Sequence, residues 1–207
     1  PTGVYCEAMD DIVTRIAHSK NPDSKCKMIW VDETYINYLP DAVSLEPLCG
    51  SLPELVVCKS MSKCYALSGL RVAYAVSQHM PTLRRYIPPW AVSLPGQLAA
   101  VAALRNTAYY EAQYGIIHQQ RAAMQTTLEG LGFRVFSGVA NYLLTYLPAA
   151  SGFTSLRFIE ACRAKGLFVR DAQNMGVMLP NNAVRFAVRS PEENEKMLGI
   201  VDAVLAS

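Results

Sequence analysis

Three short segments in the first part of the chain are apolar at nearly every position. They are Lys27–Asp32, Leu55–Cys58 and Val72–Val76. A strand with one face in water alternates apolar and polar residues, whereas a strand without that alternation is covered on both faces. Loops or helices separate the three segments. The pattern therefore predicts an α/β fold in which a mainly parallel sheet is covered on both sides.

The last third of the chain has a different order of elements. The periodicity predicts strands over 133–136, 142–145, 167–170 and 184–188, and helices over 156–165 and from 190 onward. Gly166 is placed to end the first of these helices. Ser190, Pro191 and Glu193 match an N-cap, a first helical residue and the acidic residue of a capping box. This ββαββα order predicts a smaller α+β domain.

Composition excludes several classes of function. The chain is 51% hydrophobic and 17% charged with a net charge of +2, which excludes intrinsic disorder. We find no basic stripe for nucleic acid, no apolar run near the ~20 residues of a membrane span and no signal peptide. The six cysteines form no CxxC pair and the three histidines have no metal-ligand spacing. We expect a cytoplasmic globular protein with reduced thiols, no metal site, and no nucleic-acid or membrane partner.

The most specific stretch of the sequence is Ser60–Ala73, which reads SMSKCYALSGLRVA. Lys63 follows a buried strand, two serines precede it, and Arg71 comes eight positions later. A lysine amine forms a Schiff base with an aldehyde only when it is deprotonated, which burial or nearby positive charge favours. The apolar strand before Lys63 and Arg71 after it suit both conditions. Taken alone, the lysine of a Ser-Lys pair is more often a solvated loop residue than a catalytic one.

The whole string resembles the cofactor-attachment signature of class I/II aminotransferases, the fold-type I pyridoxal-phosphate enzymes. Pro1–Gly3 resembles the end of the family's Asn-Pro-Thr-Gly motif, and Asp32–Tyr35 resembles its Asp-x-x-Tyr motif. Val184–Asn194 resembles the C-terminal segment of the histidinol-phosphate aminotransferase branch, and threonine-phosphate decarboxylases of that branch look equally close. The resemblance runs from Pro1 to about Ala206.

The resemblance implies a role for each residue of a cofactor site. Lys63 would carry pyridoxal 5'-phosphate as a Schiff base and move the substrate proton. The other implied cofactor ligands are Asp32 for the ring nitrogen, Tyr35 for the ring oxygen, and Ser60, Ser62 and Arg71 for the phosphate. Asp32 also ends an apolar strand, at the sheet edge where ligands bind in open α/β folds; a turn or helix N-cap is the alternative. We interpret Glu33 as a solvated loop carboxylate without a role.

Arg185 is the first candidate for a substrate-binding residue. In the strand around it, Val184, Phe186 and Val188 share one apolar face. Arg185 is on the other face, flanked there by Ala183 and Ala187, and so points away from the apolar packing. The family places its substrate-carboxylate arginine here; a surface arginine is the alternative. Arg170 aligns with a second anion-binding arginine of the branch. Asn141 resembles part of the small-domain pocket or, alternatively, caps a turn.

The resemblance also implies a domain organisation and missing parts. Residues 1–95 would be the C-terminal part of the cofactor-binding large domain, 96–130 connecting helices broken near Arg105–Thr107, and 131–207 the small α+β domain. A complete family member is about twice as long, so we expect the N-terminal half of the large domain from a longer parent or a second chain. Family members are usually homodimers, which we also expect.

The sequence leaves three functions open. The first is a pyridoxal-phosphate-dependent aminotransferase that takes a small amino acid or amine, phosphorylated or not, together with a keto acid. The second is a decarboxylase of a phosphorylated amino acid, since both reactions break a bond at the substrate α-carbon. The third is a non-catalytic aminotransferase-like module.

Overall fold

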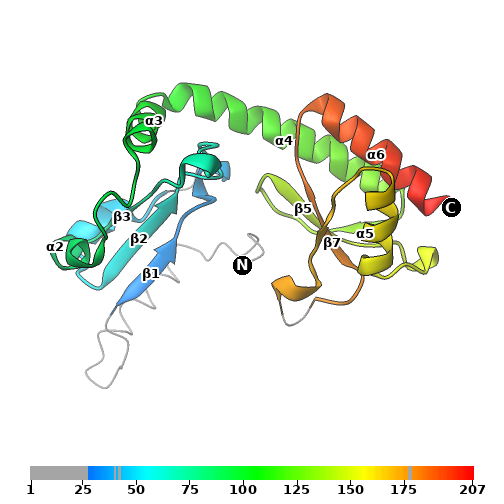
Figure 1. Cartoon of the computed structure of the whole chain (residues 1–207), viewed down its shortest axis with the longest axis horizontal. Helices are drawn as coiled ribbons and strands as arrows, with labels where there is room; N and C mark the ends of the chain where they lie inside the picture. Colours follow the sequence, from blue (N-terminus) through cyan, green and yellow to red (C-terminus); the bar gives the residue numbers. More distant parts are fainter. Residues whose placement is uncertain (1–27, 40, 42, 177–178) are drawn as a thin grey trace, which may run out of the picture. The chain divides into compact units, whose positions relative to one another are not determined.

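The computed structural model describes residues 28–39, 41, 43–176 and 179–207 (Figure 1). The chain forms two compact units, which are described separately: one contains the described residues up to Ala112, and the other is Gln113–Ser207. The Pro1–Gly3 motif lies outside the described residues, and so does Met9–Ala17, where apolar residues at helical spacing predict a helix. The division into 1–95, 96–130 and 131–207 stays a prediction.

The first unit contains a three-stranded sheet in the order β1-β2-β3. β1 (Ile29–Asp32) runs parallel to β2 (Leu55–Ser60), and β3 (Ala73–Val76) runs antiparallel to β2. The three predicted strands are therefore present, within two residues of their expected ends. The described sheet has one parallel and one antiparallel pair.

One face of this sheet is covered by the segment that precedes β2. Leu55 and Val57 point to that face and pack against Leu45 and Cys49, all of them fully or almost fully buried. Cys49 belongs to the short 3-10 helix η2 (Glu46–Gly50), and Leu45 is the residue just before it. Pro47 lies in the first turn of this helix. Burial of these side chains anchors β2, the central strand.

Helices connect this sheet to the second unit. After α2 (Met80–Leu83) come α3 (Leu94–Leu104) and α4 (Thr107–Gly130). The hydroxyl of Ser93 caps α3 by accepting a hydrogen bond from the Gly96 amide at 3.2 Å. The break between α3 and α4 lies at Arg105–Asn106, as the sequence predicts.

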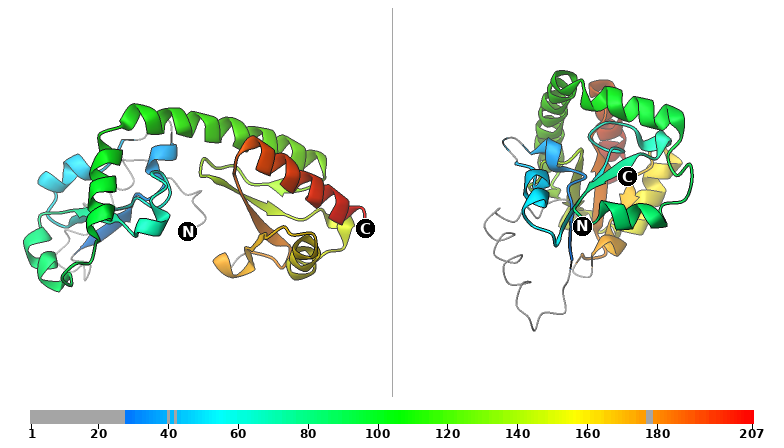
Figure 2. Two further views of the ribbon diagram at one scale, coloured as in Figure 1. Left: turned by 45° about the horizontal axis from the view of Figure 1, so that its top comes forward. Right: turned by 90° about the vertical axis from the view of Figure 1, so that its left-hand side faces the viewer.

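The second unit contains an antiparallel sheet in the order β4-β5-β7-β6. Its elements in chain order are β4 (Arg134–Val135), β5 (Tyr142–Tyr146), α5 (Ser155–Ala164), β6 (Arg170–Asp171), β7 (Ala183–Ala187) and α6 (Pro191–Leu205). The predicted ββαββα order is confirmed. Figures 1 and 2 show α5 and α6 on one side of the β5–β7 pair.

The core of this unit lies between that face of the sheet and the helices. Alternate residues of β7, Val184 and Phe186, point into it and are buried to 1% exposure or less. Phe186 meets Phe133 and Phe158 edge to face, with ring centroids 5.8 and 6.4 Å apart. Met124, from the second half of α4, completes the cluster.

The helix ends follow the sequence signals, with one shift. The Ser190–Glu193 capping box is present at the start of α6. Gly166 follows α5 with a φ of +82°, and the Leu167 amide donates to the Cys162 carbonyl at 2.9 Å. β6 begins only at Arg170, so the strand predicted over 167–170 is wrong at its start: the first residues past this C-cap do not pair with a strand.

Two properties of the described residues bear on function. None of the described helices is long and apolar enough to pass through a bilayer. Within the described ranges, no group of three His, Cys, Asp or Glu side chains is arranged to hold a metal ion.

Candidate functional site

Three of the predicted cofactor residues meet at one edge of the β1–β3 sheet. Asp32 is the last residue of β1, and Ser60 is the last residue of the parallel strand β2. β3 runs the other way, and Ser60 pairs with its first residue, Ala73. Arg71, two residues before Ala73, therefore lies at the same edge as Asp32 and Ser60. This is the carboxyl edge of the parallel pair, where ligands bind in open α/β sheets.

A closed loop from Met61 to Val72 carries the remaining residues. The Met61 amide donates to the Val72 carbonyl at 3.0 Å, which joins the two ends of the loop. Ser62 and Lys63 lie near its start, and the hydroxyls of Ser60 and Ser62 are 2.8 Å apart. The loop thus brings two serine hydroxyls, a lysine and Arg71 to one strand end.

Arg71 adopts an unusual backbone conformation in this loop. Its φ and ψ are +54° and +47°, the left-handed region that side chains other than glycine rarely occupy. Its guanidinium is exposed and donates one hydrogen bond, to the Ser68 carbonyl at 3.2 Å. Such strain, about 1–3 kcal/mol, recurs at ligand-binding positions. Two hydroxyls and a guanidinium are a donor set that suits a phosphate.

Asp32 is held by the turn that follows it. Its Oδ1 accepts hydrogen bonds from the amide of Thr34, at 2.9 Å, and from the Thr34 hydroxyl. Within the described residues, Oδ2 takes part in no hydrogen bond or ion pair. The turn-forming role and the predicted cofactor role are therefore compatible, because they use different oxygens of one carboxylate.

Lys63 departs from one sequence expectation. We expected burial to favour its deprotonated form, but its side chain is exposed, because the loop extends past the sheet edge. The backbone around it is fixed: its carbonyl accepts a hydrogen bond from the buried Tyr38 hydroxyl at 3.3 Å. Tyr35 is half-buried, with its ring 6.3 Å from that of Tyr38. The roles of Lys63 and Tyr35 stay predictions.

Glu33 is not the solvated carboxylate that we expected. It is 5% exposed, and it accepts hydrogen bonds from the Ser44 hydroxyl at 2.7 Å and the Leu45 amide at 2.8 Å. Its Oε2 also lies 3.2 Å from Nζ of Lys59. The expectation failed because residues 44–46 fold over the sheet, a long-range contact that local sequence does not reveal.

The sequence analysis missed Lys59, although a signal was present. Lys59 lies two residues after Val57 and four after Leu55, so the two-residue period of a strand places its charge on the same buried face of β2. Burial alone would lower the pKa of Lys59, but the carboxylates of Glu46 and Glu33 raise it. The Glu46 carboxylate in turn accepts a hydrogen bond from the Tyr74 hydroxyl at 2.9 Å. Burial and then Glu46 raise the pKa of Tyr74, so this phenol stays neutral.

The second unit pairs the two predicted anion-binding arginines. Arg170 of β6 lies directly opposite Arg185 of β7, so the two side chains share a face of the sheet. Like charges in such a pair repel, and neither arginine forms an ion pair with any residue of the described ranges. The Arg185 guanidinium lies 4.7 Å from the centre of the Tyr142 ring, a cation–π contact that orients it.

Asn141 lies beside the same two strands, at the start of β5. Its carbonyl accepts a hydrogen bond from the Val188 amide at 2.9 Å, which extends the β5–β7 ladder by one residue. The role of its side chain stays a prediction.

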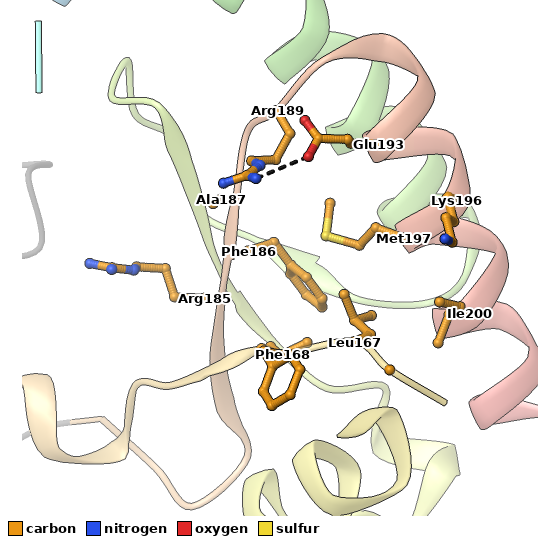
Figure 3. Close-up of a pocket in the computed structure, with 12 residues that line it drawn as sticks. Leu167, Phe168, Arg185, Phe186, Ala187, Arg189, Glu193, Lys196, Met197 and Ile200 are labelled. Atoms are coloured by element: carbon orange, nitrogen blue, oxygen red, sulfur yellow. Dashed lines mark hydrogen bonds and ion pairs between the residues drawn. The ribbon is translucent and has the colours of Figure 1, made fainter. Parts of the chain in front are cut away.

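A pocket of about 420 Å³ lies on the other side of β7. It is enclosed by residues 166–169, β7 and α6, and Arg189 and Glu193 form an ion pair at 2.9 Å beside it. Figure 3 shows Phe186 directed toward Met197 of α6, whereas the Arg185 guanidinium points away from these side chains. Arg185 is thus among the residues that line the pocket, but its guanidinium extends away from it.

Comparison with known proteins bears on this arrangement. Residues 16–201 match the family model described as aminotransferase class I and II. A histidinol-phosphate aminotransferase of Acinetobacter baylyi is 28% identical over 183 residues, which are 86% of this chain and 48% of the relative. The chain therefore spans about half the length of this curated relative.

Solved structures give the same fold. L-threonine-O-3-phosphate decarboxylase from Porphyromonas gingivalis has a TM-score of 0.83 at 21% identity, over 100% of this chain and 62% of its own. Histidinol-phosphate aminotransferase from Sinorhizobium meliloti, in complex with pyridoxal-5'-phosphate, has a TM-score of 0.79 at 20% identity, over 100% and 55%. At these identities the structures establish the fold, and the predicted fold class is confirmed. With the family match over most of its length, the chain belongs to the class I and II aminotransferases.

Proposed function

We propose that this chain is part of a pyridoxal-phosphate-dependent aminotransferase that acts on a small amino acid or amine, phosphorylated or not, and a keto acid. One observation carries the proposal: Asp32, Ser60 and Arg71 lie at one sheet edge, and a closed loop from that edge contains Ser62 and Lys63. No other described part of the chain combines a lysine, a carboxylate and a phosphate donor set at a strand end.

The residues present fit the cofactor. The Ser60 and Ser62 hydroxyls and the Arg71 guanidinium suit its phosphate, and Oδ2 of Asp32 suits a protonated ring nitrogen. Tyr35 follows Asp32 in the turn, and we assign its phenol to the ring oxygen. When bound, pyridoxal phosphate supplies an electron sink for the bond broken at the substrate α-carbon.

The chain's own residues would then divide the work. The Asp32 carboxylate accepts the ring N–H and keeps that nitrogen charged, while the Thr34 turn keeps the carboxylate in place. The Lys63 amine would attach the cofactor and, once the substrate amine has displaced it, would be free to take the α-proton as a general base. Ser60, Ser62 and Arg71 would hold the cofactor phosphate.

Arg185 and Arg170 are proposed to hold the anionic groups of the substrate, with Asn141 beside them. The support is that the two arginines lie opposite each other in the β6–β7 pair, and neither forms an ion pair with another described residue. An anion between them would relieve their repulsion, and a guanidinium fork matches a carboxylate or a phosphate with two parallel hydrogen bonds.

A phosphoamino-acid decarboxylase is the second candidate. The L-threonine-O-3-phosphate decarboxylase of P. gingivalis has the same fold as this chain, so we retain this reaction as an alternative. The two reactions differ in which α-carbon bond is held perpendicular to the cofactor ring. Release of carbon dioxide from a phosphorylated substrate would support the decarboxylase, and keto-acid-dependent turnover would support the aminotransferase.

Further polypeptide is proposed to complete the enzyme, either the N-terminal half of a longer parent or a second chain. In support, the first unit exposes large apolar side chains: Trp30 is 56%, Trp90 95% and Leu94 66% exposed. We also propose that the complete protein, meaning this chain with whatever polypeptide belongs to it, is a cytoplasmic homodimer. Sedimentation of the purified complete protein would test the dimer.

Absorbance spectroscopy of the complete protein tests the proposed function. We expect a band near 420 nm, roughly, from cofactor attached to a lysine, and its loss in Lys63→Ala. A colourless protein that takes up no added pyridoxal phosphate would instead support a non-catalytic aminotransferase-like module.

A further inference from the structure

Glu33 and Lys59 lie behind the candidate site. Along a strand, successive side chains point to opposite faces. Lys59 therefore shares a face with Val57, while its neighbour Ser60 points to the other face. Glu33 follows Asp32 in the same manner, and its amide donates to the Cys58 carbonyl at 2.8 Å, extending the parallel ladder by one residue.

The two side chains form a buried ion pair. The Glu33 and Lys59 side chains are 3% and 10% exposed, and their charged atoms are 3.2 Å apart. Glu33 makes two further hydrogen bonds, to Ser44 and Leu45. Lys59 also contacts Glu46 at 2.7 Å and donates to the Ser44 hydroxyl at 3.0 Å. Buried charges with this many partners are held in one geometry, since loss of a partner leaves a charge uncompensated.

We propose that the Glu33–Lys59 ion pair is a positioning device for the bound cofactor. It joins the residue after Asp32 to the residue before Ser60, and so fixes the ends of β1 and β2 against each other. The inference rests on the proposed function, in which these two strand ends hold opposite sides of one rigid ring. A small relative shift of the ends would then weaken both sets of contacts.

Glu46 provides a matched control for this role. It contacts the same Lys59 nitrogen and carries the same charge, but it belongs to η2, which bears none of the candidate site residues. Glu33→Gln and Glu46→Gln therefore remove equal charge from one cluster. Only Glu33→Gln removes the ion pair between the ends of β1 and β2.

The experiment uses the complete protein and both variants. Each is freed of cofactor and titrated with pyridoxal 5'-phosphate to obtain a dissociation constant. The pH at which the absorbance of the bound cofactor changes is then measured, together with the thermal unfolding midpoint. We expect Glu33→Gln to raise the dissociation constant on the order of tenfold, comparable to the effect of removing a partner that orients a metal ligand, and to shift the absorbance midpoint. Glu46→Gln should lower thermal stability but leave both cofactor readouts at the wild-type values.

Each other outcome overturns the inference in a distinguishable way. If both variants weaken cofactor binding equally, the cluster supports the fold and has no particular link to the cofactor. If Glu33→Gln binds like wild type, the ion pair does not position the site. If the wild-type protein itself takes up no pyridoxal phosphate, the proposed function fails, and the inference fails with it.

Discussion

The two sheets of this chain place their charges differently. In the Gln113–Ser207 unit, Val184 and Phe186 of β7 point into an apolar core cluster, and the charged Arg185 lies on the opposite face of the strand. In the β1–β3 sheet, the core face of β2 is apolar at Leu55 and Val57 but ends in Lys59.

This difference predicts in which unit a substitution can change ligand binding without changing stability. In the second unit, the core around Val184 and Phe186 lies on the opposite face from the predicted anion site, although a smaller apolar cluster that includes Leu144 shares the Arg185 face. Substitutions in that core and at Arg185 should therefore have separable effects on stability and anion binding. In the first unit, the buried charge cluster lies directly behind the strand ends that carry Asp32 and Ser60. Substitution of Glu33 or Lys59 should therefore affect packing and the site together, whereas Glu46→Gln should affect packing alone.

The largest expected effect is in the loop of the first unit. Lys63→Ala removes the proposed point of attachment and general base, and we expect turnover to fall by at least about 10²–10⁴-fold. The cofactor should still bind, but reversibly, because Asp32 and the phosphate ligands remain. Steady-state kinetics with dialysis of the cofactor measures both effects. Near-normal turnover would remove the assignment of Lys63.

The core of the second unit should affect stability alone. Phe158→Ala deletes a fully buried ring that packs against Phe133 and Phe186, and we expect a loss of about 3–5 kcal/mol in unfolding free energy. Cofactor affinity should not change. Leu156→Ala, at a 59% exposed position of the same helix, should stay within about 0.5 kcal/mol of wild type in chemical denaturation. A large loss of cofactor affinity in Phe158→Ala would contradict the separation of the two roles.

The opposite face of the same sheet should affect anion binding. Arg185→Lys keeps the charge but loses the planar fork, so anionic substrates should bind about 1.5–3 kcal/mol more weakly, with cofactor affinity unchanged. Arg189→Lys is the control, because Arg189 is exposed and already paired with Glu193. Unchanged substrate KM in Arg185→Lys would exclude the proposed carboxylate site.

Arg170 tests whether the substrate carries a phosphate. If Arg170 binds a second anionic group, Arg170→Lys should penalise a phosphorylated substrate more than its unphosphorylated analogue in kcat/KM. Equal penalties for the two analogues would exclude the phosphorylated substrate class.

Local patterns in the sequence were sufficient to predict which residues of the second unit face its core and where its last helix begins. Alternation placed Phe186 in the core and Arg185 on the other face, and Ser190 with Glu193 marked the start of α6. These features depend on neighbouring residues in one strand or one helix turn. The shared edge of Asp32 and Ser60 was also predictable, because each residue ends a strand of a parallel pair. Arg71 reaches that edge only because β3 runs antiparallel, which the sequence analysis did not predict.

The charge cluster of the first unit was not predictable in the same way. Burial of Glu33 depends on Ser44 and Leu45, which reach it only after the chain has folded over the sheet. Exposure of Lys63 likewise depends on how far its loop extends beyond the sheet edge. Both outcomes are set by contacts between segments distant in sequence, on which local periodicity carries no information.

The smallest expected effect concerns Cys58, which lies directly opposite Asp32 in the β1–β2 register and is half-buried. Burial and then the Asp32 carboxylate raise the pKa of the Cys58 thiol. Because the thiolate is the reactive form, alkylation should accelerate only at a higher pH than for an ordinary cysteine. Asp32→Asn removes the repelling charge and lowers that pKa, so at fixed pH below the midpoint alkylation should quicken by roughly a few-fold.

This test relates Asp32 to its surroundings without requiring any turnover. The rate is measured with iodoacetamide across pH, and the labelled peptide is identified by mass spectrometry. Asp171→Asn, at the end of β6 in the other unit, is the matched control and should leave the Cys58 midpoint unchanged. Added pyridoxal phosphate should slow the wild-type reaction, because the proposed cofactor site lies at the same strand ends. A midpoint that does not move in Asp32→Asn would show that the carboxylate does not act on this end of β2. In that case, the interacting charges of the first sheet would be only Glu33, Lys59 and Glu46, which lie on the buried face of that sheet.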